Sequence, residues 1–263
     1  MKQYHMPILS NVQVSARYWK MTLDMSGVGQ IIKPGQFFHI RCTNELSPFL
    51  RRPLSIYLIN YQSNTLEFLY LVKGAGTAEL TKKEAGETAD LLGPLGHGFS
   101  LSAETKEILL TARGVGIATL AALAQEAVEN GIGCTAILSA RSKDDLLSAN
   151  KLEELGVSVL KVTEEEGTSG VDHVETLMRN IIQERQVASL FTCGSRRLSL
   201  LNQRLLTEYG LTGEIALEEQ MGCAMGACFS CVSPIVEDNG EEKSVRVCYE
   251  GPVFPLEKVV IAE

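Results

Sequence analysis

The stretch "EILLTARGVGIATLAALAQEAVENG", residues 107–131, decides how the second half of this chain folds. A short apolar run comes first, a Gly-x-Gly turn follows, and a long apolar segment then runs to a closing glycine. This order predicts a buried strand, a tight turn and a helix, which together form the first half of a βαβ unit.

The same rhythm continues toward the C-terminus. Three more short apolar runs occupy residues 134–140, 157–162 and 187–193, and each precedes a segment with helical periodicity. Strands that alternate with helices are typical of a parallel sheet whose two faces are covered. We therefore expect a parallel-sheet domain over residues 101–210.

The first hundred residues follow a different pattern. Strand-like segments at residues 35–42, 50–59 and 65–72 succeed one another with only turn residues between them. Closely spaced strands without intervening helices favour a small antiparallel β-barrel over residues 1–100. With a small subdomain over residues 211–263, the sequence predicts a chain that combines α+β and α/β architecture.

The composition of the chain limits the kinds of partner that it can bind. The 263 residues carry a net charge of −8 and are 45% apolar, so a broad surface for nucleic acid or anionic lipid is not expected. The N-terminus has no continuous apolar core, and no later apolar run approaches the roughly 20 residues that span a bilayer. The sequence predicts a cytoplasmic protein that binds neither nucleic acid nor membrane.

Three of the seven cysteines are isolated within strand-like runs. Cys42, Cys134 and Cys193 each stand alone among apolar residues. Cysteine is among the most frequently buried residue types, so we interpret these three as core residues.

The remaining four cysteines form a motif near the C-terminus. Cys223, Cys228, Cys231 and Cys248 follow the spacing C-x4-C-x2-C-x16-C, which is the plant-type arrangement for a [2Fe–2S] cluster. Small residues, including Gly222 and Gly226, would let the backbone approach such a cluster. Structural zinc is an alternative, although zinc ligands usually come in two short pairs, and free or disulfide-bonded cysteines are another.

Two further motifs are weak when each is taken alone. "RRPLS" (51–55) could be a solvated edge strand, and "KGAGT" (73–77) could be a turn with a helix cap. In this order, however, they resemble the flavin-binding barrel of the ferredoxin–NADP reductase superfamily. The resemblance implies an FAD site formed by Arg52, Pro53, Leu54, Ser55, Leu69, Tyr70, Leu71, Gly76 and Thr77.

The chain departs from that superfamily at two places. Its relatives often have arginine at the position of Leu71, and Lys73 is the candidate replacement for this charge. In the Gly-x-Gly turn, Gly114 and Gly116 would bind the pyrophosphate of a pyridine nucleotide, or would serve only tight packing. Arg113 stands where relatives have glycine, so we hypothesise weak NAD binding or another electron acceptor.

The ending "RVCYEGPVF" (246–254) extends the resemblance to the full length. Barrel, nucleotide domain and cysteine motif, in this order, resemble the electron-transfer subunits of class 1B dihydroorotate dehydrogenases. The resemblance implies that a separate FMN-containing catalytic subunit oxidises dihydroorotate in pyrimidine biosynthesis. Electrons would then pass through the cluster and FAD to NAD⁺, in a heterotetramer with two copies of each subunit.

Such a relay requires no catalytic side chain in this chain, because the cofactors perform the redox chemistry. Two other functions stay open. The chain could be the flavin and iron–sulfur subunit of an NAD(P)-linked hydrogenase or of a ferredoxin-dependent transhydrogenase. It could also be a non-enzymatic, zinc-stabilised interaction module.

Overall fold

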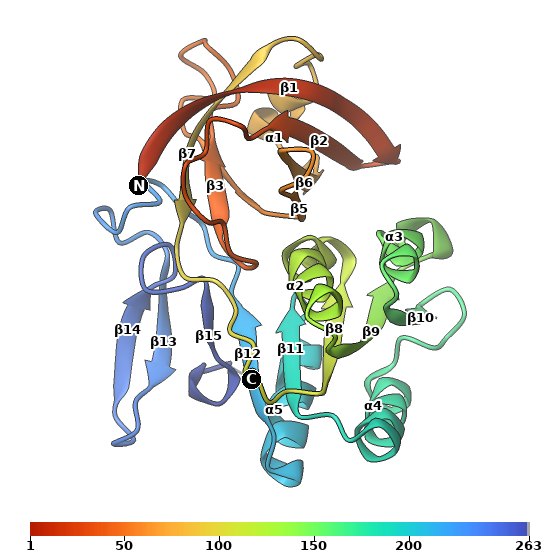
Figure 1. The fold of residues 1–263 in the computed structure, drawn as a ribbon. Coiled ribbons are helices and arrows are strands. Elements are labelled where there is room, and N and C mark those ends of the chain that lie inside the picture. The colour runs from red at the N-terminus through yellow and green to blue at the C-terminus, as the bar shows by residue number, and fades with distance from the viewer. Residues whose placement is uncertain (262–263) are drawn as a thin grey trace.

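The computed structural model describes residues 1–261. A curved antiparallel sheet stacks on a second sheet that is flanked by helices, and a two-stranded hairpin stands beside the second sheet (Figure 1). The fold class predicted from the sequence is confirmed.

The first sheet is entirely antiparallel and follows the order β4-β3-β7-β1-β2-β6-β5. Because β4 also packs against β6, the sheet curves back on itself as a half-barrel. Its strands are β1 (Lys2–Ser15), β2 (Tyr18–Asp24), β3 (Phe37–Ile40), β4 (Arg52–Ser55), β5 (Leu58–Asn60), β6 (Thr65–Leu71) and β7 (Thr88–Leu95).

Alternating side chains fill the inside of the half-barrel. Along β6, Leu66, Phe68 and Tyr70 are almost fully buried. The spacing of two follows from the pleat, which sends successive side chains to opposite faces of a strand. Phe38 meets Phe68 edge to face, with ring centroids 5.9 Å apart. This core holds β3 and β6 together from opposite sides of the barrel.

The only α-helix of the described barrel residues, α1 (Ala75–Leu80), begins earlier than the sequence predicts. The sequence predicts a short helix over Ala78–Lys83, directly after the KGAGT stretch. The Thr77 hydroxyl accepts hydrogen bonds from the backbone N–H groups of Lys73, at 3.0 Å, and Gly74, at 3.3 Å. These bonds satisfy N–H groups at the helix start, so the first turn forms around Thr77 rather than after it.

The second sheet has the order β10-β9-β8-β11-β12-β15. All neighbouring strands are parallel except β12 and β15, which pair antiparallel. The strands are β8 (Glu107–Arg113), β9 (Gly133–Ala140), β10 (Ser158–Thr163), β11 (Ser189–Cys193), β12 (Thr212–Ala216) and β15 (Val253–Pro255).

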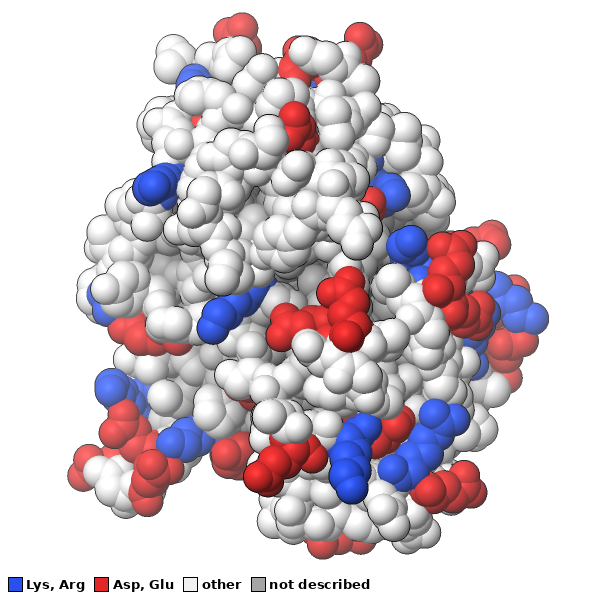
Figure 2. All heavy atoms as spheres, in the orientation of Figure 1, with Lys and Arg blue, Asp and Glu red and all other residues white. Residues whose placement is uncertain are grey.

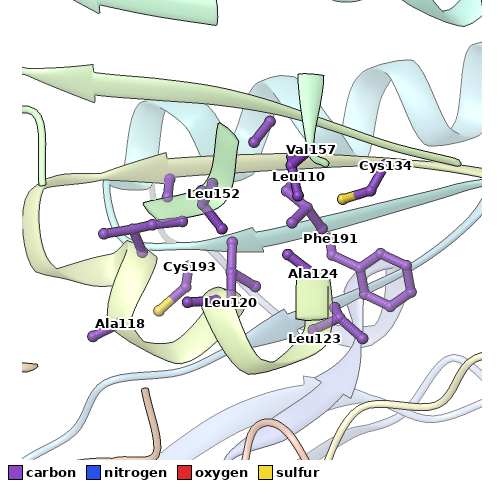
Figure 3. Packing of buried hydrophobic residues seen from close by; sticks show 14 of the residues in the cluster. Leu110, Ala118, Leu120, Leu123, Ala124, Cys134, Leu152, Val157, Phe191 and Cys193 are labelled. Atoms are coloured by element: carbon purple, nitrogen blue, oxygen red, sulfur yellow. The ribbon is translucent and has the colours of Figure 1, made fainter. Parts of the chain in front are cut away.

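Helices cover both faces of this sheet, as expected for βαβ units. α2 (Ile117–Glu129) and α3 (Ala149–Glu154) pack on one face, whereas α4 (Val171–Arg185) and α5 (Arg196–Tyr209) pack on the other. Figure 3 shows side chains of the first face, among them Leu110, Leu120 and Phe191. Tyr57 and Leu69 of the barrel join the same buried cluster, so the two sheets share a core. Short 3-10 helices occupy Gly114–Gly116, Lys143–Asp145 and Leu256–Lys258.

The C-terminal segment serves two structures. It contributes β12 and β15 to the second sheet, and it forms the hairpin of β13 (Val232–Val236) and β14 (Glu242–Arg246). The division into residues 1–100, 101–210 and 211–263 stays a prediction.

Charges are unevenly distributed on the face drawn in Figure 2. Acidic and basic side chains alternate over the second sheet and its helices, and fewer lie over the barrel. Across residues 1–261, no helix combines the length and the apolar character that crossing a bilayer requires.

Candidate functional site

A groove of about 440 Å³ lies between the barrel and the second sheet. Most of the residues that were predicted to contact FAD line this groove together, although they come from two separate strands and from helix α1. They are Arg52, Pro53, Leu54, Ser55, Leu69, Tyr70, Leu71 and Thr77. The remaining predicted residue, Gly76, packs beside the groove rather than lining it.

Gly76 lies directly against Arg52. A Cβ added at Gly76 would be only 2.7 Å from Arg52 Nε, so a side chain at this position would displace the guanidinium. Arg52 Nη1 donates hydrogen bonds to the carbonyl oxygens of Leu50, at 2.7 Å, and Arg51, at 3.1 Å. The guanidinium is therefore held at one end of the groove, where its remaining N–H groups can meet an anionic group such as a diphosphate.

Tyr70 is predominantly a barrel residue. Its side chain is 1% exposed, and its hydroxyl donates a hydrogen bond to Asn11 Oδ1 at 3.0 Å. Burial raises the pKa of the Tyr70 hydroxyl far above its usual value. The hydroxyl is thus already engaged and is not free to bind a ligand.

The groove also contains residues that sequence reasoning did not assign. Val115, Ala118 and Thr119, from the turn before α2 and its first residues, form the wall opposite the barrel. Glu218 lies on the lining as well. The sequence did not mark these four residues as part of a flavin site, because they reach the groove only through the packing of the two sheets.

Glu218 and Lys73 bring opposite charges into the groove. Glu218 is accessible to solvent, yet protein atoms surround it closely enough that desolvation raises the pKa of its carboxyl group, with Lys73 opposing the rise. Lys73 therefore supplies a positive charge close to Leu71, the position at which the resemblance to the reductase superfamily leads us to expect an arginine.

The two glycines of the Gly-x-Gly turn do not line the groove. Gly114 has a φ of +56°, in the left-handed region that favours glycine. A Cβ at Gly116 would lie 2.1 Å from the carbonyl oxygen of Cys193, so Gly116 allows the turn to pack on the end of β11. Close packing therefore accounts for Gly116. Binding of a nucleotide by this turn stays a prediction.

Arg113, the last residue of β8, has protein partners. Its Nη1 donates to the Ser139 hydroxyl at 2.7 Å, and its Nη2 pairs with the Glu164 carboxylate. These contacts join the carboxyl ends of β8, β9 and β10, the sheet edge at which nucleotides bind in open α/β folds. Arg113 thus stabilises this edge in the described structure.

The four predicted cluster ligands lie in two close pairs. The backbone N–H of Cys228 donates to Cys223 Sγ at 3.4 Å, and the backbone N–H of Cys248 donates to Cys231 Sγ at 3.4 Å. Cys228 is exposed, whereas Cys231 and Cys248 are buried, and none of the seven cysteines forms a disulfide.

The pairing bears on which metal centre the residues fit. Among residues 1–261, no three His, Cys, Asp or Glu side chains converge on a position for a single metal ion. A [2Fe–2S] core distributes four thiolates over two irons, so two adjacent pairs suit it better than a mononuclear zinc site.

Backbone N–H groups surround the first ligand. Met225, Ala227 and Cys228 donate to Cys223 Sγ at 3.4, 3.3 and 3.4 Å. Burial raises the pKa of the Cys223 thiol, but these bonds outweigh it and lower the value to about 6. The thiolate is the form that binds metal, so the lowered pKa favours the form of Cys223 that a cluster would require.

The loop holds this shape at a local conformational cost. Ala224 and Phe229 both have a φ of +56°, which is uncommon for residues other than glycine. Arg246 fastens the loop to β14, because its Nη1 donates to the Gly226 carbonyl at 3.0 Å. The Arg246 guanidinium also stacks on the Phe229 and Tyr249 rings, 5.3 and 4.7 Å from their centroids.

Comparisons with known proteins agree with this geometry. The family model for the iron–sulfur cluster binding domain of dihydroorotate dehydrogenase B matches residues 218–260. A protein from Desulforamulus reducens named dihydroorotate dehydrogenase B (NAD(+)), electron transfer subunit, is 32% identical over 98% of each chain. A protein of the same name from Bacillus cereus strain B4264 is 35% identical and covers 99% of this chain and 100% of its own.

Solved structures support the fold. The structure of an NADH-dependent reduced ferredoxin-NADP oxidoreductase has a TM-score of 0.81 and 27% identity, and covers 97% of this chain and 89% of its own. A ferredoxin-NADP⁺ reductase from Plasmodium falciparum, at 14% identity and a TM-score of 0.64, covers 79% of this chain and 91% of its own. The full-length matches at 32% and 35% identity show that this chain belongs to the family of dihydroorotate dehydrogenase B electron transfer subunits.

Proposed function

We propose that this chain carries electrons from an FMN-containing, dihydroorotate-oxidising partner subunit through a [2Fe–2S] cluster and FAD to NAD⁺, in pyrimidine biosynthesis. One observation carries the proposal. The segment that reaches the groove at Glu218 continues directly into the loop that holds Cys223, Cys228 and Cys231. The flavin groove and the cluster loop are therefore joined through a few residues of one chain.

The cysteine pairs define the ligand roles. Cys223 and Cys228 would hold one iron, and Cys231 and Cys248 the other. Backbone N–H groups directed at Cys223 would stabilise the negative charge of its thiolate and of the cluster. Because Cys228 is exposed, this edge of the loop is the side that a partner subunit can approach.

The groove residues define the flavin site. Leu54, Leu69 and Leu71 would pack on the ring system, and the Ser55 hydroxyl would hydrogen-bond to its edge. Arg52 would pair with the pyrophosphate. When bound, FAD would supply hydride exchange with NAD⁺ and single-electron exchange with the cluster.

NAD⁺ would bind where Gly114 and Gly116 turn toward α2, with Val115 and Thr119 lining the groove beside them. Together with the partner subunit, this chain would form a heterotetramer that contains two copies of each subunit. We further propose that residues 1–100 and 101–210 are the FAD and nucleotide domains, and that residues 211–263 form the cluster subdomain.

The test combines this chain with the catalytic subunit encoded in the same organism. We expect two flavins, FAD and FMN, together with iron and acid-labile sulfide in the purified complex. Adding dihydroorotate without oxygen should bleach the flavin absorbance, and NAD⁺ should restore it. A colourless complex that contains zinc would overturn the proposal.

A second function has one specific observation in its favour. The ferredoxin-NADP oxidoreductase structure matches 97% of this chain at 27% identity, which fits a subunit of a ferredoxin-dependent transhydrogenase. Reduction of the bound flavin by NADPH together with a larger flavin subunit, and not by dihydroorotate, would establish this alternative.

A further inference from the structure

Arg246 connects the two segments of the chain that carry the predicted cluster ligands. It lies two residues before Cys248, and its carbonyl oxygen accepts hydrogen bonds at 2.9 Å from the N–H groups of Tyr249 and Glu250. Its side chain reaches back to the loop of the other three cysteines, where Nη1 donates to the Gly226 carbonyl at 3.0 Å. Arg246 is therefore bonded both to the turn that carries the fourth ligand and to the loop that carries the first three.

The Arg246 guanidinium is closely packed at this position. Gly226 is buried and has a φ of +80°, and a Cβ added there would lie 3.2 Å from Arg246 Nη1. The guanidinium also stacks on the rings of Phe229 and Tyr249, whose centroids are 5.3 and 4.7 Å away. Its positive charge is thus held beside the cysteine loop.

Glu250 balances this charge. Its carboxylate accepts hydrogen bonds from Arg246 Nε, at 3.1 Å to each oxygen, from Arg246 Nη2, and from the backbone N–H of Arg246 at 2.7 Å. The side chains of Arg246 and Glu250 are 27% and 36% exposed, so water screens the pair only in part. Removing one partner would leave a single uncompensated charge beside the loop, which is positive without Glu250 and negative without Arg246.

An iron–sulfur cluster is sensitive to such a charge. Reduction adds one electron and makes the cluster more negative, so a nearby positive charge favours the reduced form and a nearby negative charge favours the oxidised form. Charge and hydrogen bonding around a cluster are among the features that set its reduction potential.

We propose that Arg246 and Glu250 together set the reduction potential of the cluster. Arg246 is a positioning residue that holds the loop and supplies a positive charge, and Glu250 limits the effect of that charge. This inference rests on the proposed function, because it requires a [2Fe–2S] cluster in the loop, and it adds two residues that are not ligands.

The experiment is a redox titration of the full-length, cluster-loaded protein, followed by the electron paramagnetic resonance signal of the reduced cluster. We expect Glu250→Gln to raise the ratio of reduced to oxidised cluster at a fixed potential roughly threefold or more, and Arg246→Gln to lower it by a similar factor. Both variants break the same ion pair, so a purely structural role would shift both ratios in the same direction. Arg246→Lys keeps the charge and should stay close to the wild type.

The matched controls are Lys243→Gln and Glu237→Gln. They break an ion pair of 2.8 Å in the same hairpin, between side chains that are 60% and 45% exposed. Lys243 lies three residues from Arg246 along β14, or roughly 10 Å at about 3.3 Å per residue, so both controls should leave the ratio unchanged.

The outcomes separate this inference from the proposed function. Shifts of the same sign in Arg246→Gln and Glu250→Gln, or no shift in Glu250→Gln, overturn the inference alone. If Arg246→Gln loses its cluster, the other two variants decide: a raised ratio in Glu250→Gln with a wild-type ratio in Arg246→Lys supports the inference, and any other result overturns it. A wild type that gives no signal of a reduced [2Fe–2S] cluster overturns the proposed function, and this inference with it.

Discussion

The cysteine loop and the flavin groove are assembled in different ways. Three of the four cysteines lie within nine consecutive residues, and the N–H groups that surround Cys223 come from its own loop. The groove instead draws on β4, β6, the start of α2 and Glu218. A site built from neighbouring residues can be recognised from spacing, whereas a site built between two sheets depends on their packing.

The difference in assembly also determines how a substitution affects each site. The loop is fastened mainly by Arg246 and by buried Cys231 and Cys248, so damage to it should remain local. The groove shares a hydrophobic core with both sheets, so damage to the packing between them should change stability and ligand binding together.

The largest effect should come from removing a cluster ligand. Cys223→Ser replaces a thiolate that receives three backbone hydrogen bonds, and we expect most of the iron and acid-labile sulfide to be lost while FAD remains bound. Metal and sulfide analysis with a visible spectrum measures this. Cys134→Ala, which removes a buried cysteine of β9, should keep the full iron content. Loss of FAD together with iron would show that the two sites are not separable.

The second-largest effect should come from a substitution in the turn beside the groove. Gly116→Ala would place a Cβ 2.1 Å from the Cys193 carbonyl oxygen, and we expect this overpacking to destabilise the protein by about 3 kcal/mol. Urea unfolding checks the free energy. Gly29→Ala is the control, because a Cβ there meets nothing within 4 Å. Equal stability of the two variants would contradict the packing role of Gly116.

A smaller effect should follow from the charge at the phosphate end. Arg52→Ala removes a charge-assisted hydrogen bond worth about 1.5–3 kcal/mol, so FAD affinity should fall roughly 10- to 100-fold. Titration of flavin-depleted protein measures the change, and Arg17→Ala, at an exposed position whose side chain does not line the groove, should bind FAD normally. Weakened binding in both variants would instead indicate a general effect of charge.

The smallest effect concerns Glu218 and depends on pH. Desolvation raises the pKa of its carboxyl group above the usual 4.5, so the folded state binds a proton more readily than the unfolded state. The contribution of this group to the free energy of unfolding is therefore fully present below pH 4.5 and is lost as the pH rises through the raised pKa of the folded state. Glu218→Gln should be more stable than the wild type at pH 7 by a few tenths of a kcal/mol, because solvent screens the charge, and should match it at pH 4.

Urea unfolding at both pH values tests this expectation, with Glu219→Gln as the neighbouring control. The same gain in stability at pH 4 and pH 7 would show that the effect of Glu218 does not come from its charge.

Much of the architecture could be predicted because it rests on local patterns. The alternation of Leu66, Phe68 and Tyr70 predicts a strand with one face in a core, and the segments after residue 107 predict strands and helices in turn. The start of α1 was placed too late, because the cap comes from the side chain of Thr77 inside the helix rather than from a residue before it. Nor does any local pattern reveal that Arg113 pairs with Glu164 across the sheet edge.

The sequence by itself determined the four-cysteine spacing, the change from antiparallel to parallel rhythm near residue 100, and the residues of β4 and β6 that line the groove. Only the tertiary structure decided that Val115, Thr119 and Glu218 complete the groove, that Gly116 serves packing, and that the cysteines lie in two pairs. The physical reason is the separation along the chain between the residues concerned. Backbone geometry relates residues a few positions apart, whereas contacts between distant segments exist only once the shared core has brought the two sheets together.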